Sequence, residues 1–324
     1  RSLEGLQFAG IGNTVWDTLS GVQVAGWVNV VKGGMLGTQI SGLCNVTTQD
    51  LNGAQIAGLV NVTVHDVQKT QVAGLVNYGR NVEGAQVAGV ANTTFGNVGG
   101  GQIAGVINAA RSVSGGQVSG VINLAIDTVR GAQVGVLNIG RVVRGGQVGV
   151  INISDTIVGV SVGVFSFARR GYHRFDVVTD DVLPLTFQLR TGTRAFHNIL
   201  GYSPGAGTNR DWGFLYGLGT EPRLGKRMFL NIDLSVEQIN EGSEWVEAVN
   251  QLDRLTIAAG LNIGKHLTIS AGPTANMFLT DWRNADTGEY LSRVPPSSVA
   301  YHTTKDAVRV DVWPSWRAAL GVRF

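Results

Sequence analysis

Histidine and serine side chains in the second half of the chain are the first candidates for chemistry. His197, Ser203 and His302 would combine an imidazole base with a hydroxyl nucleophile, the pairing that acyl transfer uses. Nothing in their spacing calls for that role, and a solvated or interior histidine is the simpler interpretation. None of the five histidines has the spacing of a metal-ligand motif. We therefore expect no enzyme activity, and neither a cofactor nor a metal site.

Glutamine and asparagine recur at fixed positions in the first half. The segments GAQIAGLVN, GAQVAGVAN and GGQIAGVIN, which begin at Gly53, Gly84 and Gly100, are nearly identical. The glutamine returns every 14 to 16 residues, and an asparagine follows it by six residues in the first eight copies and by five in the next two; Ser161 and Ser166 take these positions in a degenerate eleventh copy. The members of these two series that we predict to form side-chain ladders are Gln55, Gln71, Gln86, Gln102, Gln117, Asn61, Asn77, Asn92, Asn108 and Asn123.

A repeat of this length can hold two short strands and two corners, but it cannot bury an apolar face alone. Stacking identical copies solves this, so residues 1–167 are predicted to form a β-solenoid of about 11 short rungs. At about 4.8 Å per rung the rod would be roughly 50 Å long. Each amide would bond its copies above and below. Ligand binding by the amides, or glycosylation at the Asn-Val-Thr, Asn-Thr-Thr and Asn-Ile-Ser sites, is the alternative interpretation.

The period changes to two after Arg169 and Arg170. In RMFLNIDLSVEQ, apolar residues from Met228 to Val236 alternate with polar ones, which is typical of a strand with one apolar face. Similar segments occur at 172–179, 184–192, 195–203, 211–219, 252–264, 266–278 and 308–324. Residues 168–324 are therefore predicted to form an antiparallel β-barrel of about eight strands, with a long loop at 279–305 before the last strand. The fold class expected for the whole chain is all-β.

The two faces of the predicted strands suit a barrel in a membrane. The polar face carries both signs of charge, which would pair in a packed interior. The basic residues are Arg190, Arg309, Arg317 and Arg323, and the acidic residues are Asp233, Glu237 and Asp311. Aromatic residues at the strand ends would supply interfacial girdles. The candidates are Trp212, Tyr216, Trp282, Trp313 and Trp316.

Two resemblances follow from these motifs. The GxQVAGxxN repeat resembles the surface-repeat modules of bacterial envelope proteins whose biochemical role is unknown. The last segment, AALGVRF, resembles the targeting signal of outer-membrane β-barrels, with Phe324 as the terminal aromatic residue. These resemblances imply the outer membrane of a Gram-negative bacterium, with outer-membrane lipid and an envelope protein as partners, and they carry no catalytic residues.

Composition sets further bounds. The net charge of +2 gives no electrostatic case for nucleic-acid binding. The single cysteine, Cys44, excludes an internal disulfide and takes a position where other repeats have valine. No apolar run is long enough for a transmembrane helix. No signal peptide is visible and the first repeat starts at Gly5, so we expect a processed or truncated beginning.

We expect a non-enzymatic envelope protein that presents a rigid solenoid for binding or structural support. Three alternatives remain open: an accessory or plug subunit of a larger outer-membrane secretion complex, a barrel enzyme that modifies envelope lipid through His197 or Ser203, and a soluble adhesin. An even number of strands would place the solenoid in the periplasm, whereas the repeat resemblance suggests the cell surface.

Overall fold

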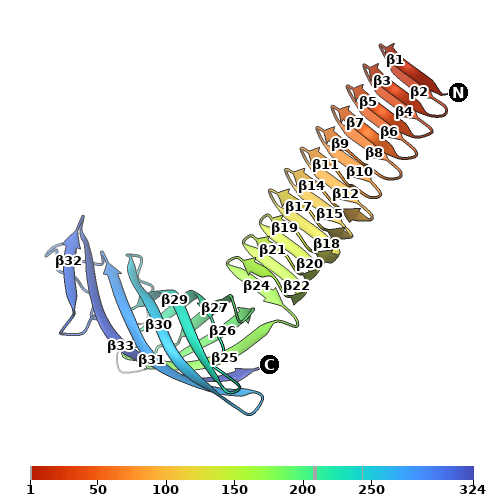
Figure 1. The fold of residues 1–324 in the computed structure, drawn as a ribbon. Helices are drawn as coiled ribbons and strands as arrows, with labels where there is room; N and C mark the ends of the chain where they lie inside the picture. Colours follow the sequence, from red (N-terminus) through yellow and green to blue (C-terminus); the bar gives the residue numbers. More distant parts are fainter. Residues whose placement is uncertain (1, 207–209, 243) are drawn as a thin grey trace. The chain divides into compact units, whose positions relative to one another are not determined.

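The computed structural model describes residues 2–206, 210–242 and 244–324. The chain divides into two compact units, Arg1–Arg170 and Gly171–Phe324. The described residues contain only strands, turns and loops, so the expected all-β class is confirmed. The first unit is a parallel β-solenoid and the second is a closed antiparallel barrel (Figure 1).

The first sheet of the solenoid contains the glutamine series. Its eleven strands run parallel in sequence order, each paired with the strand of the next rung. They are β1 (Leu3–Ala9), β3 (Leu19–Ala25), β5 (Met35–Ser41), β7 (Leu51–Ala57), β9 (Thr70–Ala73), β11 (Ala85–Ala88), β14 (Gly101–Ala104), β17 (Gly116–Ser119), β19 (Ala132–Val134), β21 (Gly146–Val148) and β23 (Val160–Val162).

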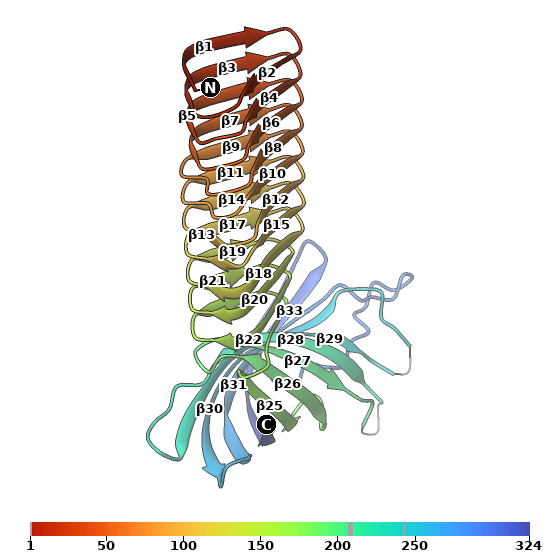
Figure 2. The same cartoon turned by 90° about the vertical axis from the view of Figure 1, so that its right-hand side faces the viewer.

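The second sheet contains the asparagine series and stacks in the same order (Figure 2). Its main path is β2 (Gly12–Val15), β4 (Val28–Val31), β6 (Cys44–Thr47), β8 (Val60–Thr63), β10 (Val76–Gly79), β12 (Ala91–Thr94), β15 (Ile107–Ala110), β18 (Ile122–Val129), β20 (Leu137–Val143), β22 (Ile151–Ile157) and β24 (Phe165–Ala168). Two short strands, β13 (Asn97–Val98) and β16 (Ser112–Val113), join this sheet beside the main path.

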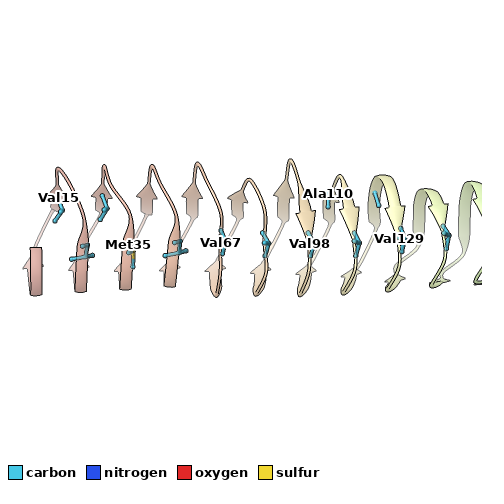
Figure 3. Packing of buried hydrophobic residues seen from close by; sticks show 13 residues of the cluster. Val15, Met35, Val67, Val98, Ala110 and Val129 are labelled. Atoms are coloured by element: carbon cyan, nitrogen blue, oxygen red, sulfur yellow. The ribbon is translucent and has the colours of Figure 1, made fainter. Parts of the chain in front are cut away.

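Register in both sheets aligns each residue with its counterpart in the next repeat. Gln55 pairs with Gln71 in the first sheet, and Asn61 pairs with Asn77 in the second. A narrow apolar core fills the interior, as Figure 3 shows for the buried hydrophobic residues of successive rungs. Its members are Val15, Leu19, Val31, Met35, Leu51, Val67, Val82, Val98, Ala110, Val113, Ala125, Val129 and Val143. The apolar position four residues before the glutamine therefore lies inside.

The corner between the two sheets requires glycine because the stacked backbones approach closely there. A Cβ atom on Gly58 would collide with the carbonyl oxygen of Gly42 in the rung before it. A Cβ on Gly101, in the first sheet, would meet nothing closer than 3.9 Å, and other rungs carry alanine at that position. Of these two glycines, only Gly58 at the corner is therefore required for steric reasons.

The barrel has eight strands, and pairing between its first and last strands closes it. The strands are β25 (Tyr172–Asp180), β26 (Thr186–Gly192), β27 (His197–Ser203), β28 (Trp212–Thr220), β29 (Met228–Asn240), β30 (Asn250–Ile263), β31 (Leu267–Thr280) and β33 (Val308–Arg323). The predicted number of strands and their antiparallel order are confirmed. The segment 279–305, predicted as a loop, contains a further strand, β32 (Tyr301–Lys305), which forms a hairpin with β33.

The two ends of the barrel differ in their connections. At one end the strands are joined by the segments 193–196, 221–227 and 264–266, and we call this the short-turn end. At the other, the long-loop end, the connections are 181–185, 204–211, 241–249 and 281–307. Both Tyr172, the first residue of β25, and Arg323, the last of β33, lie at the short-turn end, because the number of strands is even.

Candidate functional site

The glutamines form one continuous hydrogen-bonded ladder inside the solenoid. From Gln23 to Gln147, each Nε2 donates to the Oε1 of the glutamine in the preceding rung at 2.7–3.0 Å. The ladder stops at Ser161, whose side chain is too short to continue it, and the Oε1 of Gln147 has no partner. Repetition of one residue type is what allows every amide to be satisfied in a buried position.

The asparagines form a second ladder whose hydrogen bonds point the opposite way. Each Nδ2 from Asn13 to Asn138 donates to the Oδ1 of the asparagine in the following rung at 2.9–3.0 Å. The dipoles of the two ladders are therefore opposed along the rod. The same Nδ2 groups also donate to backbone carbonyls, as Asn61 does to Val72 at 2.7 Å, which fastens consecutive rungs together.

The predicted ladder residues are fully buried, so they hold the fold and offer no surface to a ligand. All ten of them have zero exposed area. The sequons begin at Asn45, Asn61, Asn92 and Asn152, and the structure buries all four side chains inside the rod. A glycosyltransferase could not reach them in the folded chain.

The exterior of the second sheet is apolar. The strands of this sheet place alternate residues outward, and the first four residues of each strand include two such positions, as Val60 and Val62 do in β8. From β4 onward these residues are Val28, Val30, Cys44, Val46, Val60, Val62, Val76, Tyr78, Ala91, Thr93, Ile107, Ala109, Ile122, Leu124, Leu137, Ile139, Ile151, Ile153, Phe165 and Phe167. We call this surface the apolar face. None of these residues is charged, so along this strip amides lie inside and mostly hydrocarbon lies outside; the charged Arg141 and Asp155 follow it on β20 and β22.

Apolar residues also stand at the corner beside the apolar face. The position that follows the glutamine is exposed in nearly every rung, and so is the apolar residue after the corner glycine. In the fourth rung these are Ile56 at 42% and Leu59 at 41%. The sequence shows that both positions are always apolar, but the repeat alone does not show that they face outward.

The barrel interior contains ion pairs that are almost completely buried. In one group, Arg174 contacts Asp176 at 2.8 Å and Glu221 at 2.6 Å, while Arg190 contacts Asp176 at 2.6 Å and Asp233 at 2.8 Å. These side chains come from different strands and from the connection after β28. Arg190 and Asp233 belong to the charges predicted to pair in the interior, and the structure shows them in contact with each other.

A second group of charges lies toward the long-loop end. Arg254 contacts Glu237 and also Asp180, the latter at 3.4 Å, and Arg317 contacts Asp180 at 3.3 Å. Between the two groups is a cavity of about 10 Å³, lined in part by Arg190, Asp233 and Arg317. That is about the space of one water molecule. The described interior is therefore packed with side chains at this level.

Apolar side chains fill the interior at the long-loop end. Leu183, Ile239, Leu252, Phe278 and Trp313 form a buried cluster, and Val182, Val294 and Val299 from the connections pack against it. The carboxylate of Glu241 accepts hydrogen bonds from Ser292 and from the backbone N–H of Arg293, the second at 2.8 Å. The connection 281–307 is thereby tied to the rim. Trp313 is buried here, so its predicted place in an interfacial girdle is wrong.

The outer wall of the barrel is apolar and carries a row of aromatic rings. Phe187 pairs with Tyr202 and Tyr202 with Phe214 across neighbouring strands. The rings of Tyr202 and Phe214 lie 5.2 Å apart, and Trp212 lies between Phe214 and Trp245. These residues are near the long-loop end of their strands. Rings that share one level on an apolar wall are typical of a membrane interface.

Small residues create a hollow in the same wall. Ala259, Ala271 and Ala318 are aligned across β30, β31 and β33. Larger residues such as Leu261 and Leu320 surround them, and the hollow has a volume of about 660 Å³. Its lining is mostly hydrocarbon, with Thr179 and Ser270 as the hydroxyl-bearing residues, so it suits an acyl chain or an apolar side chain.

The structure does not bring His197, Ser203 and His302 into one hydrogen-bonded group. His197 lies 3.1 Å from Arg190 and Ser203 donates to Glu237 at 2.7 Å, and both side chains have no exposed area. His302 is on β32 and contacts Asp311 at 2.7 Å. Each residue thus belongs to a different local arrangement, and the two buried ones have no access for a substrate.

Phe324 follows the last strand and its ring is 71% exposed. The ring stacks on His173 of β25 with 5.6 Å between centroids.

Within the described residues, no group of three or more potential ligands could hold a metal ion. No helix in the described part of the chain has the length and hydropathy to cross a membrane.

Part of the charge network in the barrel escaped prediction. The sequence contains the charged residues of the barrel interior, but Arg174, Asp176, Asp180, Glu221 and Arg254 were not recognised as partners. The available signal for an inward side chain was a charged residue between apolar neighbours, as in Asp176 between Phe175 and Val177. Comparisons with family models, curated proteins and solved structures found no match for this chain.

Proposed function

We propose that the barrel spans a bacterial outer membrane and anchors the solenoid as a rigid, non-enzymatic element for binding or structural support. One observation carries this proposal: the barrel has charges inside and hydrocarbon outside. On β29 the inward residues include Asp233 and Glu237, whereas Ile232, Leu234 and Val236 point outward and are exposed. A lipid bilayer is the environment in which a barrel with an apolar outer surface and a charged interior is stable.

The packed interior supports an anchoring role over a conducting one. Two groups of ion pairs and an apolar cluster fill the lumen in turn from the short-turn end to the long-loop end. A pore for ions or solutes needs a continuous aqueous path, and the described side chains leave a cavity of about 10 Å³ at mid-height. The barrel therefore suits attachment and not transport.

The connections support a periplasmic position for the solenoid. Outer-membrane barrels have short turns on the periplasmic side and longer loops outside. Here the chain enters β25 and leaves β33 at the short-turn end. Because the solenoid precedes β25 in the chain, it would be on the periplasmic side, and a partner would be an envelope component found there.

A matched pair of leucine variants tests the membrane role in the full chain. Leu234, in the middle of β29, is 59% exposed, and Leu224, in a short-turn connection, is 55% exposed. In a membrane, Leu234→Lys should cost roughly 2–4 kcal/mol, because a lysine on the lipid face loses its hydration. In a soluble domain the same change would be harmless.

The measurement is membrane assembly in a Gram-negative host, followed by gel migration before and after boiling. We expect the wild type and Leu224→Lys to resist alkaline extraction and to migrate differently after heating. Leu234→Lys should lose most of both properties. Equal assembly of both variants, or a wild type that is soluble without detergent, would refute the membrane barrel.

A further inference from the structure

The apolar face defined above extends over ten consecutive strands of the second sheet, from β4 to β24. Ten strands at about 4.8 Å, each about 13 Å wide, give a surface of roughly 50 Å by 13 Å. Single exposed apolar residues need no explanation, but a continuous patch above a few hundred Å² marks an interaction site. Beside it, the corner residues such as Leu59 and Leu75 widen the same surface.

Most of the charged residues of the solenoid lie beside the apolar face, either in the loops that close each rung or, for Asp127, Arg141 and Asp155, in the later part of β18, β20 and β22. Several of the basic ones are already paired with an aspartate of a neighbouring rung: Arg80 with Asp66 at 3.0 Å and Arg141 with Asp127 at 3.2 Å. Arg169 similarly pairs with Asp155 at 2.5 Å. The border of the face thus has little net charge to offer an acidic partner or an anionic lipid surface.

We propose that the apolar face packs against the apolar face of a second copy of this chain, so that the protein forms a two-fold symmetric pair of rods. The area supports this occupant. The projected surface of roughly 650 Å² corresponds to a larger accessible area once side chains and the corner are included, and a stable interface needs about 800 Å² from each partner. Homodimer interfaces are also the most apolar class.

The regular period favours a second copy over an unrelated surface. Side chains on the face repeat every rung, so ridges and hollows along the rod share one spacing. A second solenoid of the same sequence has that spacing and matches it over all rungs at once. Two such sheets would pack about 10 Å apart, as sheets do in β-sandwiches. A lipid bilayer has no matching spacing, so packing against it would gain nothing from the regular repeat of the side chains.

This inference goes beyond the proposed function and depends only on the solenoid. If the barrel is anchored in a membrane, both copies have their solenoid joined to the barrel at the same end of the rod, so we expect the parallel pair, in which each rung meets its own copy. If the chain is soluble instead, the same packing would occur in solution. Failure of the membrane role and failure of the pairing are therefore separate results.

Cys44 provides a reporter in the wild-type chain, because it lies on the apolar face in β6, the third of the eleven strands. The full-length protein would be reconstituted in phospholipid vesicles and treated with a short bis-maleimide. In a parallel pair the two Cys44 residues meet and become linked. In an antiparallel pair the third strand meets the ninth, about 29 Å away, which is beyond the linker.

Two single-cysteine variants complete the design. Cys44→Val/Ala91→Cys moves the thiol to β12, the sixth strand, which meets its own copy in either direction. Cys44→Val/Asn52→Cys moves it to the outside of the first sheet and should not be linked. We expect linking at Ala91→Cys and, for parallel rods, at Cys44, with yields that do not fall when the vesicles contain more lipid per protein.

A charged variant tests whether the face itself holds the pair. Val62→Lys places a lysine on the apolar face, whereas Val64→Lys changes a valine in the loop of the same rung. Burying an unpaired ammonium is costly, so linking at Cys44 or Ala91→Cys should fall at least about tenfold with Val62→Lys and stay unchanged with Val64→Lys.

The pairing would be refuted if neither Cys44 nor Ala91→Cys became linked in folded protein. It would also be refuted if linking fell in proportion to lipid dilution, as random collisions do. A fluorescent label on Cys44 that is quenched by brominated lipid, without linking, would show that lipid covers the face. Should Val62→Lys fail to fold, the linking and dilution results still decide the question.

Discussion

Gln71 uses every hydrogen-bonding atom of its side-chain amide inside the solenoid. Its Nε2 lies 2.8 Å from the Oε1 of Gln55 and 3.1 Å from the hydroxyl of Thr63, and its Oε1 accepts from Gln86 at 2.7 Å. A buried amide is costly unless it is satisfied in this way. At the scale of single residues, the stability of a rung therefore depends on its neighbours having the same residue.

Replacing Gln71 with alanine should destabilise the solenoid by roughly 2–4 kcal/mol, because it leaves a cavity and deprives Gln86 and Gln55 of a partner. Gln68, in the same rung, is exposed. Gln68→Ala should change stability by less than about 0.5 kcal/mol. Hydrogen exchange of solenoid peptides in the full chain measures both effects. Equal protection in the two variants would contradict a structural role for the ladder.

The thiol of Cys44 should show a pH dependence. Burial raises its pKa, because the charged thiolate is poorly solvated there. The unfolded chain, with an ordinary thiol pKa of about 8.5, ionises first. The group's contribution to stability is thus fully present below that pH and declines as the pH rises through the raised value.

Maleimide labelling measures this effect, since the thiolate is the reactive form. We expect the folded protein to react more slowly than urea-unfolded protein near pH 8, and its rate to keep rising at higher pH after that of the unfolded chain has levelled off. Identical pH profiles for the two states would show that the thiol is not shielded.

At the scale of elements, the corner glycines limit how closely rungs can stack. Gly58→Ala should cost roughly 1–3 kcal/mol, because the added methyl group meets the backbone carbonyl of Gly42 and the rungs must separate. Gly101→Ala has space and should be neutral or slightly stabilising. Thermal unfolding of the two variants makes the comparison. A loss of stability with Gly101→Ala as large as with Gly58→Ala would contradict this explanation.

Strand existence could be predicted from the sequence because periodicity reports burial directly. The predicted segments at 172–179 and 252–264 lie close to β25 and β30. The hairpin strand β32 was missed, since its burial does not alternate and Tyr301–Lys305 is largely exposed. A strand held only by pairing with β33 leaves no apolar signature to find.

Which side a residue faces was harder to predict. In the solenoid both Gln55 and Ile56 occupy invariant types of position, yet the structure puts the amide inside and the isoleucine outside. The usual rule for burial gives the opposite assignment. It fails here because a ladder satisfies the amides. Trp313 shows the same difficulty in the barrel, where a tryptophan near a strand end packs inward.

At the scale of the whole molecule, the packed lumen predicts that the barrel does not conduct ions if it spans a membrane as proposed. Full-length protein reconstituted in planar bilayers should show no stable single-channel steps, because ion pairs such as Arg174 with Glu221 and the cluster around Phe278 occupy the interior. Insertion must be verified separately by protease protection. Reproducible open states in the wild type would contradict a sealed barrel.

The opposed directions of the two amide ladders have a consequence for length. A single ladder would align its dipoles head to tail, so the dipole moment of the rod would grow with each further rung. With the glutamine bonds running toward the N-terminus and the asparagine bonds toward the C-terminus, these contributions largely cancel. A repeat can then be gained or lost with little change in the dipole moment of the rod. The length of the rod therefore follows from the number of repeats, without an electrostatic cost that grows with each one.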